Sequence, residues 1–93
     1  MTYNLKFKVE ALKEWKRLDN SLKKQFKKKL AERLEEPHVA SARLHRSRNR
    51  YKIKLRSSGY RLVYEVHDET VTVEVLVIGR RDKSAVYAVA DRR

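Results

Sequence analysis

The chain has 93 residues, with 24 Lys or Arg against 12 Asp or Glu, and a formal net charge of +12. A chain of this length is expected to form one small domain, residues 1–93, whose thin core leaves many residues to serve the surface. Because it has no cysteine, disulfides and thiolate metal sites are excluded. The start MTYNLKFKVE has no long apolar run, so we expect no signal peptide or membrane span and a cytoplasmic protein.

A strand and two helices are predicted in the N-terminal half. Apolar and polar residues alternate over residues 3–9, which is typical of a strand with one wet face. Around residues 11–18 and over residues 21–35, apolar residues recur at helical spacing. Asp19, Asn20 or Ser21 can cap the second helix, and Pro37 ends it. The residues that carry these patterns are Tyr3, Leu5, Phe7, Val9, Ala11, Leu12, Trp15, Leu18, Leu22, Phe26, Leu30 and Leu34.

Three strands are predicted in the C-terminal half, over residues 50–56, 60–66 and 70–78. Residues 38–49, which precede them, have no clean period and are interpreted as a long basic loop. Gly59 closes the first hairpin, and the sequence HDET makes the second. The far end of the last strand is apolar on both sides, which indicates a central place in the sheet.

A short last helix is expected after Gly79, which would let the strand turn into it. Asp82 can cap this helix, and its inward residues would be Ala85, Val86 and Val89. The order β-α-α-β-β-β-α predicts an α+β fold with helices packed on a mostly antiparallel sheet.

The excess of positive charge should create a potential of several kT over the surface. Nucleic acid, an anionic membrane or an acidic protein could each use it. A membrane fits least, because no predicted helix pairs a basic face with a large exposed apolar one. We therefore favour nucleic acid as the partner.

Strand periodicity predicts a cationic patch. Lys52 and Lys54 face one side of the sheet because side chains alternate along a strand. Arg61, on the next strand, faces the same side, while Tyr51, Ile53, Leu55, Leu62 and Tyr64 face the core. Arg81 follows the last strand, and Tyr87 lies one turn into the last helix. Cations for phosphate beside a ring for base stacking would suit RNA.

A purely structural interpretation of this patch stays open. Lysines on an exposed strand often only keep a sheet soluble and protect its edge. Arg61 could also pair with Glu65 or Glu74.

Other residues offer little chemistry. His38, His45 and His67 are scattered without a carboxylate or histidine partner at ligand spacing, so no metal site is expected. His45 is interpreted as a surface residue rather than a general base. With only two glycines, the chain has no glycine-rich phosphate loop.

Four segments, LKEWKRL, KKKLAERLEEP, YKIKLRSSGYRLVYEV and VLVIGRRDKSAVY, closely resemble the RelE toxins of bacterial toxin–antitoxin pairs. The resemblance covers nearly the whole chain, and HVASARLHRSRNR is its least similar part. It implies the fold of compact microbial ribonucleases. It also implies a ribosome-dependent endoribonuclease that cuts mRNA in the ribosomal A site without a metal or other cofactor. The ribose 2′-hydroxyl would attack its own phosphate, leaving a cyclic phosphate and a free 5′-hydroxyl.

The resemblance also implies roles for five residues. Lys54 would be the general base and Arg81 the general acid. Lys52 and Arg61 would stabilise the charge of the pentacoordinate phosphorane. Tyr87 would stack on the base and orient it.

The implied partners are a 70S ribosome with mRNA in the A site, its 16S rRNA, and a RelB-like antitoxin whose complex with the toxin binds operator DNA. Residues expected to touch RNA or the ribosome are Arg43, His45, Arg46, Arg48, Arg50, Arg56 and Arg80. A non-catalytic binder stays open as an alternative: an RNA-binding module, or a toxin of the same superfamily with another target, such as gyrase. The presence of all five site residues favours the ribonuclease.

Overall fold

A computed structural model describes residues 2–45, 47–80 and 83–93. Two short 3₁₀ turns, η1 (Ala40–Ala42) and η2 (Asp68–Thr70), lie in connections between the main elements. The predicted order is confirmed, and the fold is α+β. The helices and strands are β1 (Asn4–Phe7), α1 (Val9–Lys16), α2 (Asn20–Glu35), β2 (Arg50–Lys54), β3 (Tyr60–His67), β4 (Thr72–Arg80) and α3 (Lys83–Arg92).

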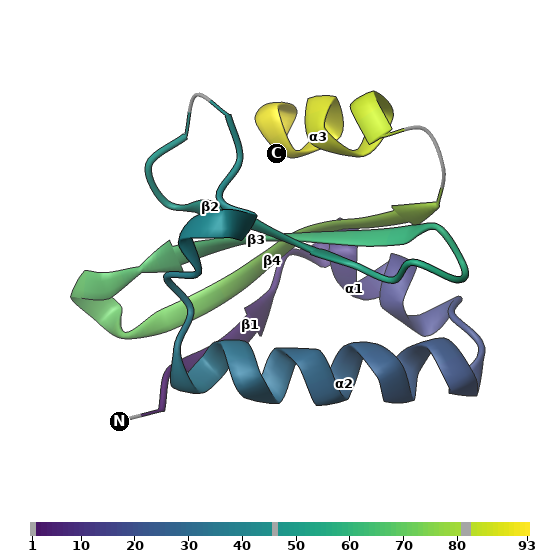
Figure 1. The fold of residues 1–93 in the computed structure, drawn as a ribbon, viewed down its shortest axis with the longest axis horizontal. Coiled ribbons are helices and arrows are strands. Elements are labelled where there is room, and N and C mark those ends of the chain that lie inside the picture. Colours follow the sequence, from purple (N-terminus) through teal and green to yellow (C-terminus); the bar gives the residue numbers. More distant parts are fainter. Residues whose placement is uncertain (1, 46, 81–82) are drawn as a thin grey trace.

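The strands form one mixed sheet in the order β1-β4-β3-β2. β1 runs parallel to β4, and the other neighbours are antiparallel. Figure 1 shows α2 on one face of this sheet and α3 on the other. β4 is therefore an inner strand covered on both faces, which explains why its far end is apolar on both sides, as predicted.

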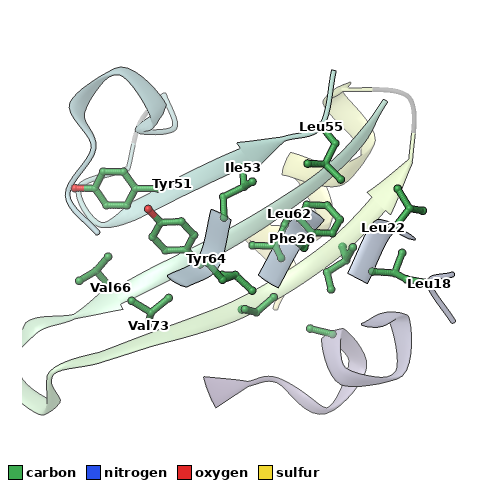
Figure 2. Packing of buried hydrophobic residues seen from close by; sticks show 14 residues of the cluster. Leu18, Leu22, Phe26, Tyr51, Ile53, Leu55, Leu62, Tyr64, Val66 and Val73 are labelled. Carbon is green, nitrogen blue, oxygen red and sulfur yellow. The ribbon is translucent and has the colours of Figure 1, made fainter. Parts of the chain in front are cut away.

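The larger core lies between the sheet and α2 (Figure 2). Leu22, Phe26 and Leu30 of α2 are buried there, as their spacing predicted. The side chain of Asp19 caps α2 by accepting a hydrogen bond of 2.9 Å from the Leu22 amide. Trp15 is only half-buried. Its ring centroid lies 5.5 Å from that of Phe7 and 6.4 Å from that of Phe26.

The first strand is shorter than its alternation predicted. Val9 was expected to continue the strand, but it begins α1 and is 69% exposed. β1 ends at Phe7, and Lys8 is the N-cap residue of α1, with an extended backbone. An alternating pattern and the first turn of a helix share these residue types, so the pattern alone could not separate them.

A second, smaller core lies beneath α3. Val63, Leu76 and Val77 pack there against Val86 and Ala90 of the helix. The outer face of the sheet was expected to be wet, and this part of it is not. Gly79 makes the packing possible, because a Cβ at this position would lie 3.0 Å from Val86 Cγ2. Gly79 lies within β4, so it serves close packing rather than the predicted turn. Asp82 and the side chain of Ala85 are outside the described part.

The described residues of the segment after α2, which was predicted as a long basic loop, include a short 3₁₀ turn and a β-bridge. The turn is η1, and Arg43 forms the isolated bridge with Tyr51. His38 contacts the Tyr51 hydroxyl at 3.1 Å and Asp68 at 2.9 Å. Hydrogen bonds from Tyr3 and then His38 hold the pKa of the Asp68 carboxyl below its usual value. The expectation that no histidine has a carboxylate partner is therefore wrong for His38. None of the described helices is long and apolar enough to cross a membrane.

Substituting Ile53 with alanine should destabilise the fold by about 2–5 kcal/mol, because a fully buried side chain would leave a cavity between β2 and α2. The free energy of unfolding from urea titration measures this change. Leu12→Ala is the matched control, since Leu12 is 39% exposed and should cost much less. Equal losses for the two variants would contradict the assignment of Ile53 to the core.

Candidate active site

The hairpin of β2 and β3 brings two cations face to face. Lys54 is the direct register partner of Arg61, and Arg61 in turn lies opposite Gly79 of β4. Lys54 is exposed, whereas Arg61 is only 8% exposed. Like charges directly opposite each other destabilise a sheet. The arrangement therefore indicates a site that receives a negative group.

The hairpin turn helps to orient Arg61. Gly59 has a φ of +78°, a left-handed conformation that glycine adopts without the clash of a Cβ. This turn directs the Gly59 carbonyl toward Arg61, whose Nη1 donates to it at 3.2 Å. The guanidinium is thus held close to the strand rather than extended into solvent.

Helix α3 adds an aromatic ring to the cations. The Nζ of Lys52 lies 6.0 Å from the centroid of the Tyr87 ring, which is within the range of a cation–π contact. Ion pairs from Arg50 to Asp91, at 2.8 Å, and from Arg93 to Glu14, at 2.9 Å, hold the C-terminal end of the chain in place. Lys52, Lys54, Arg61 and Tyr87 are therefore brought to the same face of the sheet.

Arg33 supports this site from the opposite side of the sheet, and our sequence analysis missed it. Its Nη1 donates to the Lys52 carbonyl at 3.0 Å and to the Tyr64 hydroxyl at 2.9 Å. That hydroxyl donates to the Pro37 carbonyl at 2.8 Å. Burial raises the pKa of Tyr64, and the Arg33 guanidinium opposes part of the rise. The signal was present, because Arg33 lies three residues after Leu30 and so shares the buried side of α2.

Two predicted residues, Arg81 and Arg46, lie outside the described part of the chain. Four other predicted residues lie within the described part and are exposed: Arg43, His45, Arg48 and Arg56. Arg56 lies in the hairpin turn, because β2 ends at Lys54 rather than at residue 56 as predicted. Arg43, His45 and Arg48 line an open hollow of about 560 Å³. Leu44, between Arg43 and His45, packs against the smaller core beneath α3.

Arg80 and Arg50 differ from the exposed loop residues. The guanidinium of Arg80 lies 6.0 Å from the Tyr60 ring centroid at the end of β4. Arg50 is bound to two carboxylates, those of Glu65 and Asp91. Its charge is therefore engaged within the fold, and contact between Arg50 and RNA stays a prediction.

The arrangement can stabilise a negative group, and it offers little ordinary acid–base chemistry. The sequence left open whether Arg61 pairs with Glu65 or Glu74. Val63, which is buried beneath α3, separates Arg61 from Glu65 along this face of β3. The carboxylates of Glu65 and Glu74 instead contact Arg50 and His67. Fixed cations around a phosphorane can supply electrostatic stabilisation. The tyrosine ring can stack on a base.

Comparison with known proteins agrees with this fold. Residues 5–85 match the family described as ParE toxin of the type II toxin-antitoxin system, parDE. The chain belongs to this family of toxins. It is 50% identical over 93 residues to the mRNA interferase toxin RelE of Escherichia coli strain K12, an alignment that covers 100% of this chain and 98% of the relative. The resemblance to RelE toxins is confirmed.

Solved structures of RelE have the same fold. A mutant of E. coli toxin RelE in the free state superposes with a TM-score of 0.92 at 49% identity, covering 100% of this chain and 98% of that one. The same toxin mutant in complex with a peptide of antitoxin RelBc gives a TM-score of 0.85 at 50% identity, covering 97% and 95%. The RelE-like α+β fold predicted from the sequence is confirmed.

Proposed function

We propose that residues 1–93 form one mRNA interferase domain, a cytoplasmic endoribonuclease toxin that cleaves translated mRNA in the ribosomal A site. The observation that carries this proposal is the placement of Lys54 opposite Arg61, with Tyr87 beside Lys52. The named activity of the 50% identical relative supports it. Inhibition of translation would follow from the loss of intact message.

In the proposed reaction, the Lys54 amine takes the proton of the ribose 2′-hydroxyl. The 2′-oxygen attacks the adjacent phosphorus, and a pentacoordinate phosphorane forms. Lys52 and Arg61 stabilise its extra negative charge. The bond to the 5′-oxygen then breaks, and Arg81 supplies the proton to that oxygen. The products are a 2′,3′-cyclic phosphate and a 5′-hydroxyl, and no metal takes part.

A toxin directed at another target, such as gyrase, is the second candidate, because the matching family is described by its ParE members. Primer extension on a translated mRNA after brief induction separates the two candidates. The ribonuclease should give cuts within translated codons, and the same message without its start codon should stay intact. An uncut message in cells whose growth has stopped would contradict the ribonuclease and favour another target.

We also propose that an acidic, RelB-like antitoxin neutralises the toxin and that the complex binds operator DNA. The solved complex of the related toxin with a RelBc peptide supports an antitoxin partner. The net charge of +12 would attract an acidic chain. An apolar hollow of about 280 Å³, lined by Leu5, Leu12 and Trp15 among others, offers a surface for the antitoxin's apolar residues.

Charge and apolar contact should control different rates of antitoxin binding. We expect the association rate to fall steeply from low to high salt, because long-range attraction speeds encounter. Leu12→Ser should chiefly raise the dissociation rate, since it removes apolar contact without changing charge. Stopped-flow mixing and surface plasmon resonance measure the two rates. An association rate that does not change with salt would contradict the acidic partner.

A further inference from the structure

A mixed cluster of carboxylates and imidazole lies at the far end of the sheet from the cationic site. Glu65 of β3 and Glu74 of β4 are direct register partners. The Nε2 of His67 lies 3.0 Å from Glu74 Oε1 and 3.3 Å from Glu65 Oε1. All three residues are half-buried. The sequence indicated no carboxylate partner at ligand spacing for His67, but the fold brings both carboxylates to it.

The spacing of these atoms matches a transition-metal site. One ligand atom from each residue lies within 4.8 Å of the other two. In tetrahedral zinc sites, bonds of about 2.0–2.1 Å to nitrogen and oxygen separate the ligand atoms by roughly 3.3 Å. The two contacts of His67 are already near this value. Zinc sites that keep an open position take three protein ligands, including His and Glu, and a water molecule in the fourth position.

Arg50 would orient one of the ligands. Its Nε donates to Glu65 Oε2 at 3.1 Å, which leaves Oε1 directed toward His67. Hydrogen bonds of this kind to the distal atom of a ligand are a regular part of metal sites. An open hollow of about 440 Å³, lined in part by His67 and Glu74, gives water access to the cluster.

The opposed carboxylates give the cluster a reason to hold a cation. Two like charges directly opposite each other on antiparallel strands destabilise the sheet. A divalent ion shared with His67 would neutralise both and join β3 to β4 beside the η2 turn. Within the described residues, these three are the group whose geometry could hold a metal ion.

We infer that Glu65, His67 and Glu74 form a three-residue site for a divalent transition metal, of which Zn²⁺ is the best match. The site lies beyond the proposed function, because cleavage by the cationic cluster needs no metal. It joins two central strands of the toxin and, through Arg50 and Asp91, contacts α3.

Isothermal titration of the metal-free protein with Zn²⁺, and separately with Mg²⁺, tests the site. We expect saturable binding of Zn²⁺ at one equivalent and much weaker binding of Mg²⁺, which prefers oxygen ligands. His67→Gln and Glu74→Gln should each weaken Zn²⁺ binding by more than about tenfold. His38→Gln is the matched control, because His38 contacts a single carboxylate, that of Asp68, and this variant should bind as the wild type does.

Thermal unfolding gives a second readout that does not depend on activity. At free Zn²⁺ about 100 times the dissociation constant, the folded-to-unfolded ratio of the wild type should rise about 100-fold. Glu74→Gln should fold well without metal, because it removes a like-charge pair, and the same Zn²⁺ concentration should raise its Tm much less than that of the wild type. Three results would each overturn the site: no saturable Zn²⁺ binding, unchanged binding in both cluster variants, or loss of binding in His38→Gln.

Discussion

Replacing Lys54 with alanine should lower single-turnover cleavage of ribosome-bound mRNA by about two to four orders of magnitude, the usual contribution of a general base. The exposed amine of Lys54 lies on the strand position directly opposite Arg61. Its loss removes both the proton acceptor and a charge near the phosphorane. Because these interactions form in the transition state, the cleavage rate should fall far more than affinity for the ribosome.

Lys6→Ala is the matched control for this substitution. It changes the net charge equally, and Lys6 is an exposed lysine on β1, the strand at the opposite edge of the sheet from β2. Cleavage by this variant should stay near the wild-type rate. A Lys54→Ala protein that cleaves within tenfold of wild type, or that loses ribosome binding in proportion, would contradict the role of Lys54.

The general acid is tested in the same assay. Arg81→Ala should also lower cleavage by orders of magnitude, because the 5′-oxygen would leave without a proton donor. Near wild-type cleavage by this variant would remove Arg81 from the proposed mechanism.

The wild-type protein should be nearly inactive on free RNA and fast on mRNA in the A site. The described cationic cluster supplies charge, but side chains of this kind do not hold a flexible strand in line for attack. Alignment of the 2′-oxygen with the bond that breaks can contribute roughly 7–11 kcal/mol when fully realised. We expect the ribosome to provide this alignment by holding the message. Docking of exposed residues such as Arg43 and Arg48 on rRNA would then direct remote binding energy to the reacting bond.

The cationic face was predictable because the alternation of side chains along a strand is a local property. Side chains alternate along β2 and β3, so Lys52, Lys54 and Arg61 fell on one face without any knowledge of the sheet order. The chemical roles of these residues came from the resemblance to RelE, because alternation along a strand gives only the face of a side chain. The roles remain proposals, whereas the shared face is observed for these three residues.

Features that depend on contacts distant in sequence were not predictable from the same patterns. α3 covers Val63 and Leu76 because Gly79 leaves room for Val86, and a glycine near a strand end indicates a turn equally well. The contacts of His67 depend on the register that places Glu65 opposite Glu74. Alternation predicts the face of each residue, but its partner also depends on turn geometry and on the register shift between Val63 and Tyr64.

A single-turnover comparison of one mRNA, free and bound in a programmed 70S complex with an empty A site, tests most directly whether the ribosome provides the alignment. Toxin is held in excess over RNA, so the observed rate constant reports cleavage rather than product release. We expect the bound message to be cleaved many orders of magnitude faster than the free one. Lys54→Ala should lower cleavage of the bound message by about two to four orders of magnitude. Rates within about tenfold of each other, equivalent to only about 1.4 kcal/mol, would contradict this role of the ribosome and indicate a self-sufficient ribonuclease.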